Sequence, residues 1–116
     1  MKVERTKYII WAADMTRAIK FYREVLGGTV TKQSEVISEI ELGGATIGIH
    51  GGGEGVKTWT GLSFQVPDVV EGAREIVAGG GQLTREPSSD EPDEPPHLAM
   101  CVDPEGNEIM LTRKRG

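Results

Sequence analysis

The sequence contains an internal repeat, which constrains the fold more than any other feature. Residues 7–27, KYIIWAADMTRAIKFYREVLG, have the same layout as residues 61–81, GLSFQVPDVVEGAREIVAGGG. Each copy reads as a short strand, an aspartate, an amphipathic helix and a glycine stop, and further strand-like sequence follows each. Such a repeat indicates two copies of one supersecondary unit, neither of which can bury its apolar face alone.

Both predicted helices have recognisable ends. Asp14 and Asp68 precede the two segments of helical periodicity, and an aspartate at this position accepts hydrogen bonds from free N–H groups of the first turn. Glu71, three residues after Asp68, adds a capping-box pattern. Glycines at 27–28 and 79–81 end the helices. The pattern therefore predicts one helix in each repeat.

A glycine pair fixes the register of two predicted strands. Gly43–Gly44 lies between two segments of alternating apolar residues, which is typical of a two-residue hairpin turn. This turn pairs Glu39 with Gly48. Because side chains alternate along a strand, Glu41 and His50 are then expected on the same face as Glu39.

Composition excludes several classes of protein. The chain has 116 residues, a net charge of −5 and a pI near 5.0, whereas nucleic-acid partners require basic patches. The single cysteine, Cys101, forms no internal disulfide and fits a reducing compartment. Neither a membrane-spanning apolar run nor a signal-peptide pattern is present. We therefore predict a cytoplasmic protein with no nucleic-acid and no membrane partner.

We expect a single domain over residues 1–116. It would consist of one module at 1–50 and a second at 58–116, joined by a glycine-rich linker at 51–57. Modules of this size are marginal alone, so they should fold as one unit or across a dimer. Residues 86–96, EPSSDEPDEPP, have the composition of a solvated loop, and a mobile flap over a pocket mouth is the alternative.

These motifs resemble the vicinal oxygen chelate superfamily, which includes glyoxalase I, fosfomycin-resistance transferases, extradiol dioxygenases and bleomycin-resistance proteins. The matching segments are DMTRAIKFYREVLGG at 14–28, the same pattern at 68–81 and DPEGNEIML at 103–111. The resemblance implies an α+β fold, in which two βαβββ modules form a curved mixed sheet around a cavity, often within a homodimer. It implies less about function, because a fold does not fix chemistry.

The resemblance also implies where a metal would be bound. Enzymes of the superfamily hold a divalent metal on His and Glu side chains at four positions, which correspond here to Lys7, Gly48, Gly61 and Met110. A protonated ammonium has no lone pair, glycine has no side chain, and a thioether is a poor ligand for hard ions. We therefore predict no metal, no cofactor and no catalytic residue of the family type. The two glycines are expected to leave open volume in the cavity.

Strand parity predicts the cavity wall. It mixes an indole, aliphatic groups, small residues and hydrogen-bonding groups, as ligand pockets usually do. Glu39, Glu41 and His50 would form a polar recognition cluster, a relocated metal or acid/base site, or a solvated edge or dimer contact. The predicted ligand-binding residues are Lys7, Ile9, Trp11, Glu39, Glu41, Gly48, His50, Gly61, Ser63, Gln65, Glu108 and Met110.

Three expectations concern the ligand itself. Trp11 either stacks on a flat apolar ligand or packs at a module or dimer contact. Lys7 either binds an anionic group or pairs with Glu39 or Glu108, and pairing is favoured. An acidic protein would steer a cationic ligand toward the cavity, with Glu39, Glu41 and Glu108 as its partners.

The predictions favour a metal-free small-molecule binding protein of the glyoxalase/bleomycin-resistance type, with its ligand in a cavity of a homodimer. The alternative is a glyoxalase- or dioxygenase-like enzyme, a lyase, isomerase or oxygenase, with a non-standard site near His50 and Glu39. Metal-free isomerase chemistry is a third hypothesis, and an interaction module whose cavity is filled by Trp11 and Met110 is a fourth. The sequence does not identify the ligand.

Overall fold

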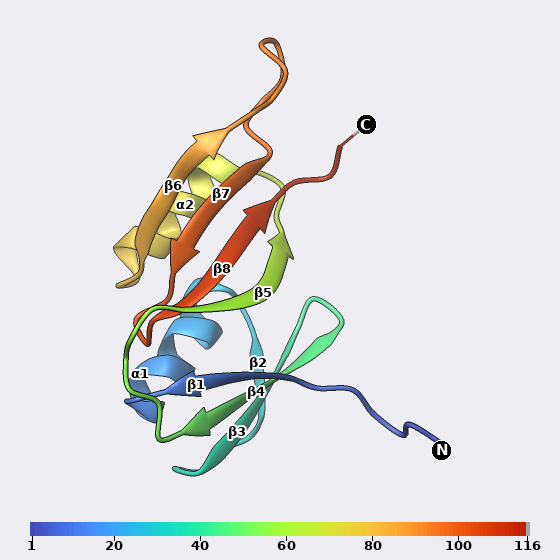
Figure 1. The fold of residues 1–116 in the computed structure, drawn as a ribbon, viewed down its shortest axis with the longest axis vertical. Helices are drawn as coiled ribbons and strands as arrows, with labels where there is room; N and C mark the ends of the chain where they lie inside the picture. The colour runs from blue at the N-terminus through green and yellow to red at the C-terminus, as the bar shows by residue number, and fades with distance from the viewer. Residues whose placement is uncertain (116) are drawn as a thin grey trace.

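The computed structural model describes residues 1–115 as two βαβββ modules (Figure 1). The N-terminal module consists of β1 (Tyr8–Ala12), α1 (Met15–Lys20), the π-helix η1 (Phe21–Val25), β2 (Thr29–Lys32), β3 (Ile37–Leu42) and β4 (Ala45–Gly51). The C-terminal module consists of β5 (Thr58–Gln65), α2 (Val69–Ala78), β6 (Gln82–Ser88), β7 (Leu98–Val102) and β8 (Asn107–Thr112). The predicted α+β class and βαβββ repeat are confirmed.

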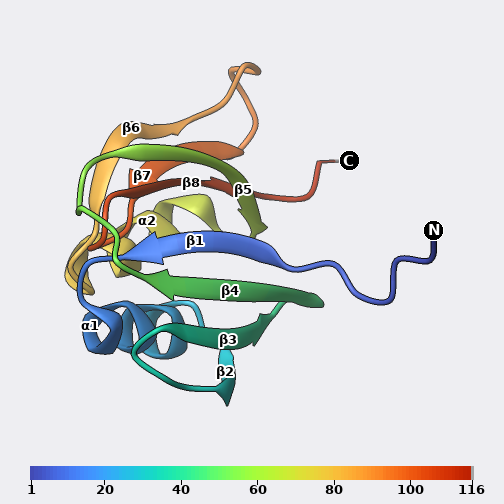
Figure 2. The ribbon, with the colours of Figure 1, turned by 60° about the horizontal axis from the view of Figure 1, so that its bottom comes forward.

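Each module contains one four-stranded mixed sheet. The strand orders are β1-β4-β3-β2 and β5-β8-β7-β6, with β1 parallel to β4 and β5 parallel to β8. Strand β1 lies on the side of its sheet nearest the C-terminal module, as Figures 1 and 2 both show. Gly43 and Gly44 both have positive φ, and the register they impose pairs Glu39 with Gly48, as predicted.

The two helices begin at the predicted caps but differ in length. Asp14 accepts a hydrogen bond from the backbone N–H of Arg17, and Asp68 accepts one from the N–H of Glu71, both at 3.1 Å. The Glu71 carboxylate accepts from Arg74 at 3.2 Å, so the structure records only half of the predicted capping box. The N-terminal helix continues from α1 into η1, whereas α2 is regular throughout. Among residues 1–115, no helix combines the length and apolar composition needed to cross a membrane.

The inner faces of both sheets pack against the helices in one apolar cluster. Side chains alternate along each strand, so every second residue enters this cluster and the others point away from the helices. The buried members are Ile10, Ala12, Ala18, Phe21, Tyr22, Ile40, Ile47, Ile49, Leu62, Val69, Ala73, Ile76, Ala99, Cys101, Ile109 and Leu111. Because both modules contribute, the cluster extends across the boundary between them.

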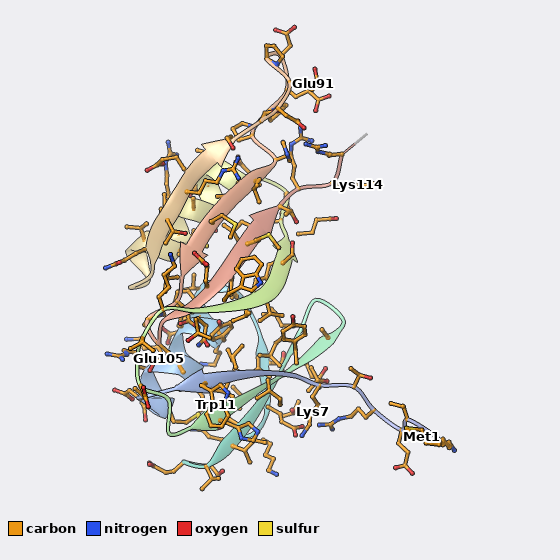
Figure 3. The ribbon with its side chains drawn as sticks, in the orientation of Figure 1. Met1, Lys7, Trp11, Glu91, Glu105 and Lys114 are labelled. Carbon is orange, nitrogen blue, oxygen red and sulfur yellow. The ribbon has the colours of Figure 1, made fainter. Side chains whose placement is uncertain are left out.

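The turn between β7 and β8 forms hydrogen bonds between the C-terminal module and the N-terminal module. The buried carboxylate of Glu105 accepts hydrogen bonds from the backbone N–H groups of Ala13 at 2.9 Å and Asp14 at 2.8 Å. Its other oxygen accepts from Nε of Arg17 at 2.5 Å. Figure 3 shows Glu105 at this turn, beside the start of α1. A residue of one module thus satisfies backbone donors at the helix start of the other.

Two neighbours of Glu105 extend this connection. The hydroxyl of Tyr22 donates to the buried Asp103 carboxylate at 2.6 Å. Nδ2 of Asn107 donates to the backbone carbonyl of Trp11 at 2.8 Å. We refer to residues 103–107 as the DPEGN turn, and its polar side chains are buried because their hydrogen bonds replace those to water.

The predicted linker and acidic loop are shorter than expected. Gly51, predicted as the first linker residue, is the last residue of β4, and β6 extends through Ser88 into the predicted loop. The remaining loop contacts the C-terminal segment. There Arg113 donates to the Glu94 carboxylate at 3.3 Å, and Arg115 donates to Asp90 at 2.8 Å. Whether the loop acts as a flap stays a prediction.

Candidate functional site

The predicted site residues lie on the sheet faces that point away from the helices. We call this surface the open face, defined by Lys7, Ile9, Trp11, Glu39, Glu41, Gly48, His50, Gly61, Ser63, Gln65, Glu108 and Met110. Their strand neighbours Ile10, Ile47 and Ile109 are buried against the helices, as alternation requires. That these residues bind a ligand stays a prediction.

In the N-terminal module, the open face is organised in rows across the strands. Ile9 on β1 and Glu39 on β3 flank Gly48 on β4. In the next row, Trp11 on β1 is paired with His50 on β4. Paired residues of neighbouring strands point to the same face, so these side chains form a continuous surface.

Glu39 is the centre of a charged network. Its Oε1 accepts from Arg5 at 2.7 Å and its Oε2 accepts from Lys7 at 3.2 Å, so the predicted pairing of Lys7 with Glu39 is confirmed. The Glu39 side chain is 11% exposed, compared with 53% for Arg5 and 33% for Lys7. The hydrogen bond from Arg5 is the main cause that lowers the pKa of Glu39, and Lys7 adds to it while burial opposes it. Glu39 is therefore held as a carboxylate.

Trp11 and His50 form the aromatic part of the open face. Their ring centroids are 5.2 Å apart and the rings are tilted by 52°. Trp11 is 50% exposed, so one side of the indole is available in the single chain. Figure 3 shows Trp11 on β1 and Lys7 just before this strand, closer to the N-terminus.

The prediction that Gly48 and Gly61 leave open volume is wrong. A Cβ added to Gly48 would lie 2.7 Å from Cδ1 of Ile9, so Ile9 already covers this position. Gly61 has a φ of +75° and lies where the β5–β8 pairing is irregular, and a Cβ there would lie 3.0 Å from the Tyr8 hydroxyl. The two glycines therefore have different roles, since one lies under a side chain and the other allows a backbone conformation that side chains disfavour.

The side chains present do not fit the metal of the superfamily's enzymes. The Lys7 ammonium is bound to Glu39, and Met110 lies between Ser63 and Met100 in the sheet register. In residues 1–115, no three His, Cys, Asp or Glu side chains gather as a metal site would require. Glu39 and His50, which the enzyme alternative needs together, are recorded with different partners, the two cations and Trp11.

Polar groups of the C-terminal half of the open face are also paired. Hydroxyl groups of Ser63 and Thr112 are 3.2 Å apart. The Glu108 carboxylate accepts from Thr84 at 3.2 Å and lies 3.4 Å from the Lys57 ammonium. Glu108 is therefore also paired with a cation.

Sequence reasoning missed three residues of this surface. Trp59 is paired with Glu108 across the strands, so it shares the open face and is 56% exposed. Sequence alternation could have placed Trp59 on this face, because it lies two residues before Gly61 and residues two apart in a strand point to the same side. Arg5 and Lys57 precede their strands, and no local pattern indicates which carboxylate each reaches.

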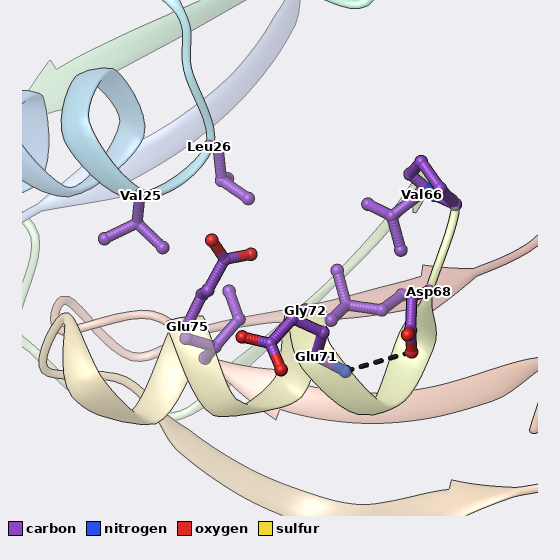
Figure 4. Close-up of a pocket in the computed structure, with 10 residues that line it drawn as sticks. Val25, Leu26, Val66, Asp68, Glu71, Gly72 and Glu75 are labelled. Carbon is purple, nitrogen blue, oxygen red and sulfur yellow. Dashed lines mark hydrogen bonds between the residues drawn. The ribbon is translucent and has the colours of Figure 1, made fainter.

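Two cavities lie beside α2. One, of about 360 Å³, lies between the end of η1 and α2, with Val25 and Leu26 on one side and Glu71 and Glu75 on the other (Figure 4). The second, of about 640 Å³, lies between α2 and β6. None of the predicted site residues lines either of these cavities, whereas Gln65 lines another, of about 330 Å³, together with Arg113.

Several solved structures have this fold at low sequence identity. FosX, a fosfomycin resistance protein from Listeria monocytogenes, has a TM-score of 0.79 and 15% identity, covering 99% of this chain and 96% of its own. The bleomycin-binding protein of Streptomyces verticillus, solved with copper(II)-bleomycin, has a TM-score of 0.69 and 16% identity, covering 99% of both chains. A glyoxalase/bleomycin resistance protein/dioxygenase family enzyme from Burkholderia phytofirmans has a TM-score of 0.74 and 21% identity, covering 92% of this chain and 95% of its own. These likenesses establish the fold.

Comparison with curated proteins gives no match. A family model is more informative, because the one described as glyoxalase-like domain matches residues 8–112. This match runs from β1 to β8 and includes both modules. It confirms the resemblance inferred from the repeat, and the chain belongs to the glyoxalase-like domain family.

Proposed function

We propose that this protein binds a small molecule without a metal, and that the ligand is held on the open face inside a homodimer. The observation that carries the proposal is Trp11, which is half exposed in a row with His50 and beside Ile9. An indole offers a large rigid surface for a flat apolar group at low entropic cost. Polar groups next to it, as here, are typical of ligand sites.

The residue types support binding over metal-dependent catalysis. The four positions that carry ligands in the family's enzymes are Lys7, Gly48, Gly61 and Met110 in this chain. One neighbour in fold, the bleomycin-binding protein of Streptomyces verticillus, fits this proposal. The proposal also includes a single domain, which consists of modules 1–50 and 58–116. It further includes a cytoplasmic location.

The exposed apolar groups support a dimer. Ile9, Trp11 and Trp59 are 39%, 50% and 56% exposed in the single chain, all on the open face. Ile9 and Trp11 share one face of β1, and exposed apolar patches are typical of interaction sites. A second copy lying over it would enclose the ligand and cover part of these side chains.

The test is a thermal-denaturation screen of untagged protein against a broad small-molecule library, with light scattering to count chains. We expect a dimer and at least one compound that raises the melting temperature by binding the folded state. The hit should lose its effect on Trp11→Ala. It should keep it on Val77→Ala, a helix residue that is also 50% exposed. No hit in the screen, or hits that bind Trp11→Ala equally well, would contradict the proposal.

The enzyme alternative makes a different prediction for the same sample. It requires stoichiometric metal that is lost when His50 or Glu39 is replaced. Elemental analysis of untagged protein, repeated on His50→Ala, separates the two functions. Metal that depends on His50 would replace the binding proposal with the enzyme alternative.

A further inference from the structure

The charges of the open face indicate the chemical class of the ligand. We infer that the ligand carries an anionic group, a carboxylate or a phosphate, held by Arg5 and Lys7, beside a flat apolar body that contacts Trp11. This inference rests on the proposed binding function. It reverses the expectation that an acidic protein selects a cation here.

The network around Glu39 carries an excess of positive charge. Two cations, Arg5 and Lys7, face one carboxylate at 2.7 and 3.2 Å. A guanidinium has five N–H donors and an ammonium has three, so both groups keep donors beyond those given to Glu39. Their side chains are 53% and 33% exposed, which makes these donors accessible to a ligand.

Glu39 also prepares the two cations for binding. It is almost buried, and it holds two long side chains that would otherwise be ordered only when the ligand arrives. Ordering in advance reduces the entropic cost of binding. The planar guanidinium of Arg5 suits the two oxygens of a carboxylate or phosphate, and charge-assisted hydrogen bonds of this type are the strong ones.

The carboxylates expected to attract a cation have other partners. Glu39 is bonded to two cations and Glu108 lies 3.4 Å from Lys57. Glu41 accepts from the hydroxyl of Thr46 at 2.8 Å and is the one acidic residue of the open face with no recorded cation partner in the described chain. The net charge of −5 therefore says little about this surface.

The spacing of the rows matches a ligand with two parts. Ile9, Gly48 and Glu39 form one row, and Trp11 and His50 belong to the next. The rows are about 7 Å apart along the strands, and Glu39 on β3 lies two strand spacings, about 10 Å, from β1. Arg5 and Lys7 precede β1 and reach across to Glu39, so a ring lying on Trp11 can extend a substituent over Ile9 toward their donors.

Four probes with the same ring test the inference: naphthoate, naphthyl phosphate, naphthylmethylamine and naphthylmethanol. Binding is followed by NMR on the full chain, with the Trp11 indole N–H as the local reporter. We expect both anions to bind about tenfold more tightly than the amine, since charge-assisted hydrogen bonds exceed neutral ones and like charges repel. Added salt should reduce this preference. The tighter of the two anions identifies carboxylate or phosphate as the source.

Two variants and a control locate the preference. Arg5→Gln should bring naphthoate affinity down to that of naphthylmethanol, and Lys7→Met should do so in part. Arg23→Gln is the matched control, because Arg23 is 51% exposed, pairs with one carboxylate and lies on η1. It should leave all four affinities unchanged.

The outcomes separate this inference from the proposed function. If the amine binds as well as naphthoate at the Trp11 signal, or if Arg5→Gln leaves naphthoate affinity unchanged, the anion inference is wrong and the binding function stands. If none of the four probes shifts open-face signals and the library screen also gives no hit, the binding function fails with it.

Discussion

The last two strands of each module are joined by a turn, and the two turns have different roles. In the N-terminal module, Gly43–Gly44 sets the register of β3 and β4, and an added Cβ at either glycine would meet no atom within 4 Å. In the C-terminal module, the DPEGN turn buries Asp103, Glu105 and Asn107 against the N-terminal module. Modules that repeat in sequence are thus not equivalent in the folded chain, because one turn acts locally and the other joins the two halves.

Removal of Glu105 should produce the largest loss of stability. Glu105→Ala leaves the backbone N–H groups of Ala13 and Asp14 without their acceptor and Arg17 without its partner. We expect the free energy of unfolding in urea to fall by about 3 kcal/mol, since losing one side of a buried charged contact leaves the other side unsatisfied.

Glu71→Ala is the matched control for this change. Glu71 occupies the first turn of α2, yet its carboxylate is 57% exposed and is bonded to Arg74 alone. Its replacement should change stability by less than about 0.5 kcal/mol. Equal losses for the two variants would show that the DPEGN turn does not join the modules as described.

The Tyr22–Asp103 hydrogen bond should be next in magnitude and should depend on pH. Tyr22→Phe removes a buried donor to a carboxylate, which should cost about 2 kcal/mol. Burial, followed by the negative charge of Asp103, raises the pKa of Tyr22 well above its usual value of 10.0. The hydroxyl therefore contributes fully below the unfolded pKa of about 10 and less as the pH rises through the higher folded pKa.

The pH dependence gives a clear measurement. The difference in unfolding free energy between wild type and Tyr22→Phe should be constant from about pH 7 to 9 and should shrink above about pH 10. Urea titrations at several pH values would record it. A difference that stays constant at higher pH would mean that Tyr22 ionises alike in the folded and unfolded chain.

The limits of sequence reasoning follow from the range of each interaction. Asp14, Asp68 and the Gly43–Gly44 register were predicted because a cap or a two-residue turn depends only on nearby residues. The bond from Ala13 to Glu105 joins residues 92 apart, and the bond from Arg5 to Glu39 joins residues 34 apart. Contacts of this kind depend on how strands and modules pack, which strand periodicity does not encode.

The open-face glycines give the smallest expected effects and compare the two modules directly. Gly61→Ala should lower stability by about 1 kcal/mol, because its φ of +75° disfavours a Cβ. Gly48→Ala should cost less than about 0.5 kcal/mol, because its new Cβ comes too close only to the tip of Ile9, which is 39% exposed and can rotate away. Urea midpoints at unchanged m-values measure both. If the two variants lose equal stability, Ile9 is held more rigidly over Gly48 than its exposure implies.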